Sequence, residues 1–141
     1  MKIKIYYDNI KFRLRETSSI KKFLEKVIRG ESRIPGDLHF IFTNDENIRK
    51  INYGFMNHDY YTDVISFGNN DGKYLDGEVY ISIDTVRSNA RIYKVRVKEE
   101  ILRVMIHGVL HLCGYEDDTS TRKEEMFRLQ EKKVNEFKWN S

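Results

Sequence analysis

The sequence predicts an α+β fold, in which a mixed β-sheet of about four strands packs against about five helices. Short stretches alternate polar with apolar residues, as strands do, and longer stretches space apolar residues three or four positions apart, as amphipathic helices do. These stretches follow one another along 141 residues without a linker, a repeat or a low-complexity segment. A chain of this length is typical of one domain, so residues 1–141 are expected to form a single compact unit.

The first third of the chain predicts a strand, a helix and a second strand. Residues 1–7 alternate polar and apolar side chains. Ser18 or Ser19 can cap a helix that runs to about Arg29, where a glycine follows. Residues 37–42, with the sequence DLHFIF, have the composition of a second strand.

The middle of the chain predicts a second helix and a hairpin. Asn44 or Asp45 can cap a helix that carries apolar residues as far as Phe55. The polar and aromatic segment 57–62 reads as a loop. The sequence NNDG at 69–72 is a strong hairpin signal. It would join strands at residues 64–67 and 78–83.

The last third predicts three helices. Asp84 can cap a helix that turns Tyr93 inward. Apolar residues are dense over Val97–Leu112, which predicts a buried helix. Thr119 or Ser120 can begin the last helix.

The composition bounds the classes of function. The net charge is +3 and the pI is near 8.9, which permits an anionic partner without demanding one. Cys113 is the single cysteine, so an internal disulfide is impossible and a reducing compartment, the cytoplasm, is expected. No apolar run approaches the ~18 residues of a membrane span, and the first residues lack the apolar core of a signal peptide.

The fourth predicted helix carries a metal-ligand pattern. His107 and His111 are four residues apart, which places both imidazoles on one helical face, so that both can bind one ion. Gly114 ends the helix, and a chain reversal there can bring Asp117 back to the same ion. The neighbouring Asp118 is the alternative third ligand. Three protein ligands leave a fourth position open for water, as in catalytic zinc sites.

The spacing matches in outline the metzincin protease pattern H-E-x-x-H-x-x-G-x-x-H, with two departures. Gly108 stands where those proteases have their general-base glutamate, so the usual peptidase mechanism lacks its proton acceptor. Asp117 stands where the third histidine is expected, and a carboxylate ligand widens the choice of metal from zinc toward manganese or nickel. Glycine costs roughly 1 kcal/mol in a helix interior, so Gly108 also indicates that something approaches this helix closely.

Three stretches of the chain resemble the YbeY family, the metal-dependent endoribonucleases of ribosomal RNA maturation. Residues 107–117, HGVLHLCGYED, resemble the family signature H-G-x-L-H-L-x-G-Y-D-H. Residues 51–67, INYGFMNHDYYTDVISF, resemble L-N-x-x-[YF]-R-x-x-D-x-x-T-[DN]-V-L-S-F. Residues 77–82, GEVYIS, resemble G-D-I-x-I-S. The order and spacing of these motifs extend the resemblance over nearly the whole chain.

The resemblance implies a zincin-like metal helix and a hydrolase that cleaves single-stranded RNA in ribosomal RNA maturation and ribosome quality control. His107, His111 and Asp117 would hold one zinc ion, or another divalent transition metal, whose bound water attacks the phosphodiester. The implied partners are ribosomal RNA and ribosomal particles, with neither a membrane nor DNA.

Two departures from the family pattern affect this chemistry. The third ligand of the family is histidine, and Asp117 takes its place here. The family also carries an arginine proposed to act at the substrate phosphate, and the matching residue here is Met56, which cannot hold a phosphate. His58, in the same loop, is a candidate replacement as a positive donor.

The sequence does not single out a catalytic residue. Glu78, Glu116 and Asp118 are candidate proton acceptors, and the 2′-hydroxyl of RNA is an alternative nucleophile. Tyrosines near the 57–62 loop could stack on bases or pack on the sheet.

A basic stripe is the candidate substrate-binding surface. Arg87, Arg91 and Lys94 follow the i, i+4, i+7 spacing of one helical face, which could track an RNA backbone. An ordinary solvated face explains the stripe equally well. Two other functions stay open: a catalytically weakened, ribosome-associated RNA-binding factor with a structural metal, and a small peptidase of metzincin type.

Overall fold

Four strands form one mixed sheet in the computed structural model, which describes residues 3–56, 64–69 and 72–140. The strands are β1 (Ile3–Tyr7), β2 (Ile34–Thr43), β3 (Val64–Asn69) and β4 (Tyr74–Ser82), and their order across the sheet is β1-β2-β4-β3. β2 runs parallel to both β1 and β4, whereas β3 is an antiparallel edge strand beside β4. The predicted mixed sheet of four strands is confirmed.

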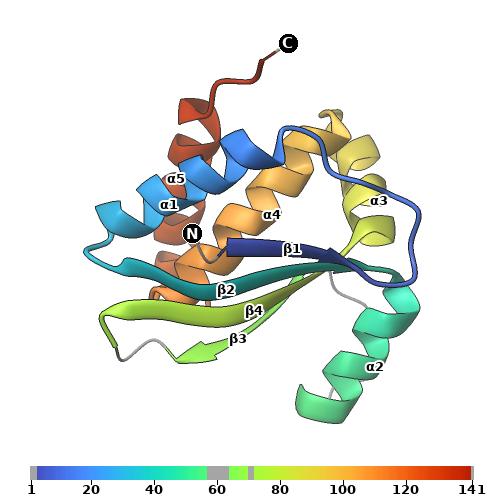
Figure 1. The fold of residues 1–141 in the computed structure, drawn as a ribbon, viewed down its shortest axis with the longest axis horizontal. Coiled ribbons are helices and arrows are strands. Elements are labelled where there is room, and N and C mark those ends of the chain that lie inside the picture. The colour runs from blue at the N-terminus through green and yellow to red at the C-terminus, as the bar shows by residue number, and fades with distance from the viewer. Residues whose placement is uncertain (1–2, 57–63, 70–71, 141) are drawn as a thin grey trace.

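Five helices lie around this sheet in the described part of the chain. α1, α4 and α5 lie on one side of it, and α2 lies beyond the other side (Figure 1). α4 packs against β3 and β4, and α5 packs on α4. The helices are α1 (Thr17–Gly30), α2 (Asp45–Met56), α3 (Ile83–Tyr93), α4 (Val97–Leu112) and α5 (Ser120–Glu136).

The core fills the space between the sheet and the helices on its packed side. Alternate residues of a strand point to opposite faces, and Phe40, Phe42, Val79 and Ile81 are wholly buried. α4 is central to this core because most of its apolar residues are buried. Each fully buried aliphatic or phenyl side chain contributes about 1.5–3 kcal/mol, so the packing of α4 against the sheet is well specified. The metal-ligand pattern therefore stands on a fixed element.

Four local expectations are wrong. α1 begins at Thr17 with Glu16 at its N-cap, so Ser18 and Ser19 lie inside the helix and do not cap it. α3 is capped by Ser82, whose side chain accepts the backbone N–H of Thr85, and Asp84 instead accepts the N–H of Asp45. β4 ends at Ser82, so the strand predicted for 78–83 is earlier and longer. Tyr93 shares the helical face of the buried Val86 but is the last residue of α3, and it is 64% exposed rather than turned inward.

Some sequence expectations lie outside the described residues. They concern the loop at 57–62 with His58 and its tyrosines, and positions 70–71 of the hairpin turn. Within the described residues, no helix has both the length and the apolar character that a membrane crossing requires.

Candidate metal centre and adjoining pocket

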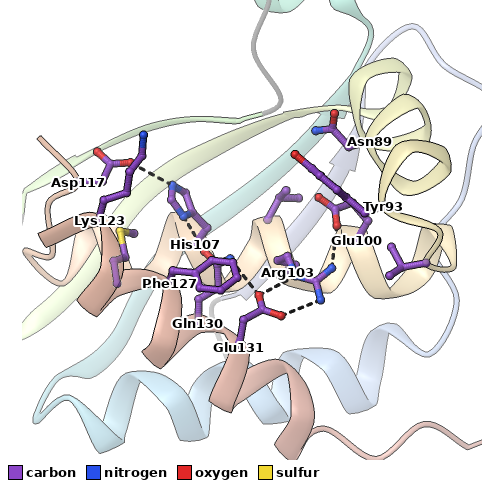
Figure 2. Close-up of a pocket in the computed structure, with 13 residues that line it drawn as sticks. Asn89, Tyr93, Glu100, Arg103, His107, Asp117, Lys123, Phe127, Gln130 and Glu131 are labelled. Carbon is purple, nitrogen blue, oxygen red and sulfur yellow. Dashed lines mark hydrogen bonds and ion pairs between the residues drawn. The ribbon is translucent and has the colours of Figure 1, made fainter. Parts of the chain in front are cut away.

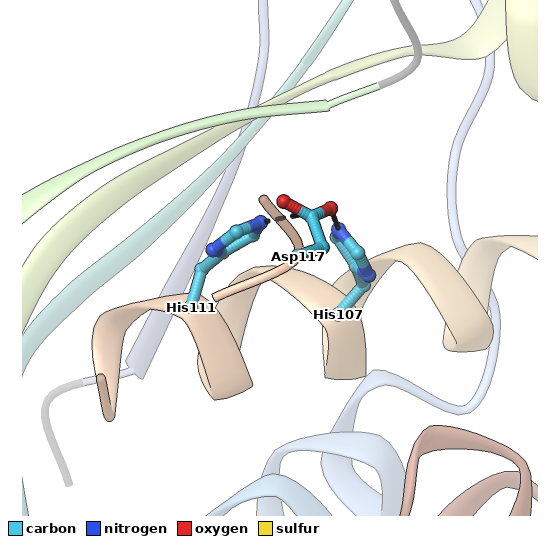
Figure 3. Close-up of side chains that lie close together, drawn as sticks. All are labelled: His107, His111 and Asp117. Carbon is cyan, nitrogen blue, oxygen red and sulfur yellow. Dashed lines mark ion pairs between the residues drawn. The ribbon is translucent and has the colours of Figure 1, made fainter. Parts of the chain in front are cut away.

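His107, His111 and Asp117 bring three ligand atoms to one point beside α4 (Figure 3). One oxygen of Asp117, Oδ2, lies 3.6 Å from His111 Nε2 and 3.9 Å from His107 Nε2. Zinc bonds of about 2.0–2.1 Å in tetrahedral geometry would place neighbouring ligand atoms roughly 3.3 Å apart. All three ligand atoms lie within 4.8 Å of one another, so small side-chain movements would suffice to hold an ion. The predicted trio is brought together, and its donor set could hold a metal.

The turn after α4 places Asp117. Gly114 has φ 106°, a conformation that favours glycine, and its N–H donates to the His111 carbonyl at 3.0 Å. The Tyr115 N–H donates to the Leu110 carbonyl at 3.0 Å, which completes a Schellman motif. The Tyr115 hydroxyl also donates to Glu31 at 2.8 Å and ties the loop to the end of α1. Burial and this bond raise the pKa of Tyr115 to about 12, so its hydroxyl stays a donor at neutral pH.

Gln130 orients one of the two imidazoles. Its Oε1 lies 2.7 Å from His107 Nδ1, and its Nε2 donates to a Glu131 carboxylate oxygen at 3.3 Å. A carboxylate only accepts, so the amide nitrogen must face Glu131 and the amide oxygen must face His107. That oxygen also only accepts, so His107 carries its proton on Nδ1 and directs the Nε2 lone pair toward Asp117. This is the arrangement that partners of metal-binding histidines commonly impose.

Gly108 allows α4 to lie against the sheet directly beside the histidines. A Cβ at this position would stand 2.7 Å from Val79 Cγ1 and 3.2 Å from Ser66 Oγ. The close approach expected from a helical glycine is confirmed: β3 and β4 are the elements that approach. Gly108, which stands where the proteases have their glutamate, is therefore required for the packing of α4 against β3 and β4.

A pocket of about 600 Å³ begins at the ligand trio and extends between α3, α4 and α5 (Figure 2). His107 and Asp117 line one end, and Tyr93, Arg103 and Phe127 line other parts of the wall. The pocket is thus continuous with the candidate metal centre.

Arg103 anchors an ion-pair network in this pocket. Its Nε donates to Glu131 at 2.7 Å, its Nη1 to Glu100 at 2.7 Å, and its Nη2 to Glu131 at 2.9 Å and Glu99 at 3.2 Å. Burial raises the pKa of the Glu131 carboxyl, but the bonds from Arg103 and Gln130 outweigh it and leave that pKa below its ordinary value. Because all three guanidinium nitrogens are engaged, Arg103 does not replace the phosphate-binding arginine that the family pattern has.

The candidate proton acceptors lie apart from the ligand trio or pair elsewhere. Glu78 precedes Val79, whose side chain faces α4, so Glu78 lies on the opposite face of the sheet. Asp118 accepts two bonds from Arg122 at 3.0 and 3.2 Å, and this guanidinium holds the pKa of the Asp118 carboxyl below its usual value. Glu116 lies 3.8 Å from the same guanidinium. Asp117, rather than Asp118, is the carboxylate that faces the two imidazoles.

The basic stripe on α3 faces away from this pocket. At 100° per residue, Arg87 and Arg91 stand about 160° around α3 from Asn89, which lines the pocket. Arg87 instead lies over the ring of Phe12, 5.7 Å from its centre, in the connection between β1 and α1. Lys94 has left-handed backbone geometry at the end of the helix. The structure does not bring this stripe to the ligand trio.

Several residues of the site were not apparent from the sequence. Lys123, Phe127 and Gln130 lie on one face of α5, at i, i+4 and i+7, and all three line the pocket. The spacing was visible in the sequence, but it also describes an ordinary solvated face. Whether this face of α5 lines a pocket or faces solvent depends on the elements that α5 packs against, and that packing is tertiary.

Comparison with known proteins identifies the family. The family model described as "Endoribonuclease YbeY" matches residues 3–138. The chain belongs to the YbeY family. It is 40% identical over 129 residues to the "Endoribonuclease YbeY" of Christiangramia forsetii, covering 92% of this chain and 90% of that protein. It is 47% identical over 107 residues to the protein of that name from Chloroherpeton thalassium, covering 76% of each.

The fold of a solved structure agrees. The solution structure of TM1509 from Thermotoga maritima superposes with a TM-score of 0.63 at 30% identity, covering 96% of this chain and 88% of that one. YbeY is a family of endoribonucleases, so the chain is a member of a family of RNA-cleaving hydrolases. The resemblance stated from the three motifs is confirmed.

Proposed function

We propose that this chain is a metal-dependent endoribonuclease that cleaves single-stranded RNA during ribosomal RNA maturation in the cytoplasm. Its ligands for one divalent ion, with zinc the first choice, are His107, His111 and Asp117. The observation that carries this proposal is the meeting of three ligand atoms within 4.8 Å, in a chain of the YbeY family. Ribosomal RNA and ribosomal particles are the partners proposed from the role of the family.

The donor set suits a hydrolytic ion. Two imidazole nitrogens and one carboxylate oxygen are ligands that zinc accepts, and three protein ligands leave a position for substrate or solvent. When bound, such an ion supplies Lewis acidity toward a phosphoryl oxygen and lowers the pKa of a coordinated water. The ligand side chains are one quarter to two fifths exposed, at 25% for His107 and 39% for Asp117, so RNA can reach them.

The protein residues divide the remaining tasks. Gln130 keeps His107 in the tautomer that turns a lone pair toward the ion. The Schellman turn at Gly114 and the Tyr115 bond to Glu31 hold the loop that carries Asp117. Lys123 lines the pocket beside the trio and makes no ion pair with the described part of the chain, so it is the proposed contact for a substrate phosphate.

Metal content and cleavage test the proposal together. We expect about one metal per chain in the purified protein, and loss of this metal in His111→Ala and Asp117→Ala. Asp118→Ala is the matched control, because that carboxylate pairs with Arg122 and should leave metal content unchanged. A single-stranded RNA should be cleaved by the loaded protein and spared after chelation.

The alternative function is a ribosome-associated factor that binds RNA around a structural metal without cleaving it. The engagement of Arg103 with three glutamates favours it, since the pocket then lacks a free guanidinium. Retained metal and RNA affinity without chelator-sensitive cleavage would select this alternative. Peptide hydrolysis abolished by a chelator would instead select the peptidase.

A further inference from the structure

The pocket beside the ligand trio has two exposed aromatic side chains on different helices. Tyr93 comes from α3 and is 64% exposed, and Phe127 comes from α5 and is 58% exposed. Figure 2 shows the Phe127 ring near His107 and Gln130, and the Tyr93 ring at the α3 end of the same pocket, near Asn89 and Glu100. Exposed rings at a binding site are platforms on which unpaired bases of single-stranded RNA stack.

The charges of the pocket disfavour a phosphate away from the ion. Glu100, Glu131 and Asp117 carry negative charge there, against the positive charges of Arg103 and Lys123. Arg103 is already bound to its glutamates and cannot turn to an anion without giving up its bonds to Glu131 and to the buried Glu100. An uncharged heterocycle therefore fits this space better than a second backbone phosphate does.

A polar group is available for the edge of such a ring. Asn89 lines the pocket, and its amide makes no hydrogen bond with the residues that the structure describes. An amide offers both donors and an acceptor, as the edge of a nucleobase requires. A volume of about 600 Å³ is in the range of pockets that hold small ligands, so one base fits with space to spare.

We propose that this pocket receives the nucleobase of a nucleotide adjacent to the scissile phosphate, stacked on Tyr93 or Phe127 beside the ion. The inference rests on the proposed function and adds a reason for strand selectivity. A base paired within a duplex cannot leave its stack to enter the pocket without an unpairing cost, whereas a base in a single strand can.

One experiment compares the removal of a base from the RNA with the removal of an aromatic ring from the protein. Single-turnover cleavage by the zinc-loaded protein is measured on a single-stranded RNA and on copies with an abasic site on either side of the cleaved bond. The variants are Tyr93→Ala, Phe127→Ala and Phe127→Leu, and the last keeps apolar bulk without a ring. Tyr74→Ala is the matched control, because Tyr74 is 58% exposed on β4 and does not line the pocket.

Stacking of one base is worth about 1–3 kcal/mol, so removal of the stacking ring should slow cleavage of the intact RNA roughly 5- to 150-fold. On the RNA that lacks the stacked base, the variant without the stacking ring and the parent protein should cleave at the same rate. Tyr74→Ala should match the parent on every RNA, and metal content should be unchanged throughout. Equal losses on intact and abasic RNA, or no loss in either aromatic variant, would overturn the proposal.

A binding measurement separates this proposal from the proposed function. Fluorescence anisotropy with the same RNAs in a chelator, which prevents cleavage, should show weaker binding when either the stacked base or its ring is removed. Failure of the proposed function would appear as no chelator-sensitive cleavage by the parent protein, whatever the binding shows. Displacement by an apolar peptide, with no effect of base removal, would assign the pocket to a peptide and overturn the inference.

Discussion

Gln130 on α5 fixes the tautomer of His107, and its replacement by leucine should weaken metal binding. The bond between Gln130 Oε1 and His107 Nδ1 is 2.7 Å long, and Gln130 is 7% exposed. Leucine has a similar volume but offers no acceptor, so the His107 proton is free to move to Nε2, the atom that must face the ion. Removing such a partner typically lowers metal affinity 10- to 100-fold, or about 1.4–2.7 kcal/mol.

The assay is a zinc titration of the metal-free protein against a chromophoric chelator, with cobalt spectra as a report of ligand geometry. Gln130→Glu keeps an acceptor oxygen and should retain the affinity of the parent protein. Lys132→Leu, an exposed position on the same helix, controls for the apolar substitution. An unchanged zinc affinity in Gln130→Leu would refute the tautomer argument. An equal loss in Lys132→Leu would assign the effect to the packing of α5 instead.

Three further predictions concern packing, ion pairing and thiol chemistry. Gly108→Ala gains helix propensity but forces α4 away from the sheet, so we expect a net loss of about 1–2 kcal/mol in urea unfolding together with weaker zinc binding. Arg103→Met removes the guanidinium that lies 2.7 Å from the buried Glu100 carboxylate, which should cost about 3 kcal/mol in thermal unfolding. The pKa of the Glu131 carboxyl is lowered from 4.5, so its ionised form stabilises the parent protein fully above pH 4.5. This stability is lost as the pH falls through the lowered pKa. In Arg103→Met the bond that lowers the pKa is absent, so the free energy of unfolding should fall less steeply with acid. Burial raises the pKa of the Cys113 thiol to about 11, so about one thiol in 1,000 is ionised at pH 8. Because the thiolate is the reactive form, alkylation of Cys113 should be roughly 100-fold slower than alkylation of a thiol of pKa 9.0. An alkylation rate equal to that of free cysteine would contradict the burial of this thiol.

The sequence specified the elements that depend on local periodicity. Val97–Leu112 was expected as a buried helix and is α4 at those bounds, because its apolar residues are dense enough to dominate any weaker preference. Thr119 or Ser120 is expected to begin the last helix, and in the structure Thr119 is the cap, whose hydroxyl accepts the Arg122 N–H at 3.1 Å. Gly114 was expected to end α4, and its positive φ does so. These are short-range effects within one or two turns of the chain.

Local periodicity also predicted most of the residues of the candidate metal centre. An i, i+4 histidine pair shares a helical face whatever surrounds it, so His107 and His111 needed no tertiary information. The return of Asp117 was foreseeable from Gly114, but the choice between Asp117 and Asp118 was not. In the structure, Asp117 faces the two imidazoles, whereas Asp118 pairs with Arg122 in the first turn of α5.

Tertiary packing decided which residues surround the candidate metal ligands. The sequence placed Tyr93 inward and offered Glu78 as a proton acceptor, yet the first lies exposed beside the pocket and the second faces away from α4. The sequence did not indicate that Gln130 contacts His107, since a polar residue at helical spacing is the commonest feature of a solvated helix. Periodicity determines which residues of one element share a face, and so the sequence by itself determined the ligand face of α4. Which faces then meet depends on how the sheet, α3 and α5 bury their apolar surfaces against one another, and only that packing set Gln130 on His107 and opened the pocket beside it.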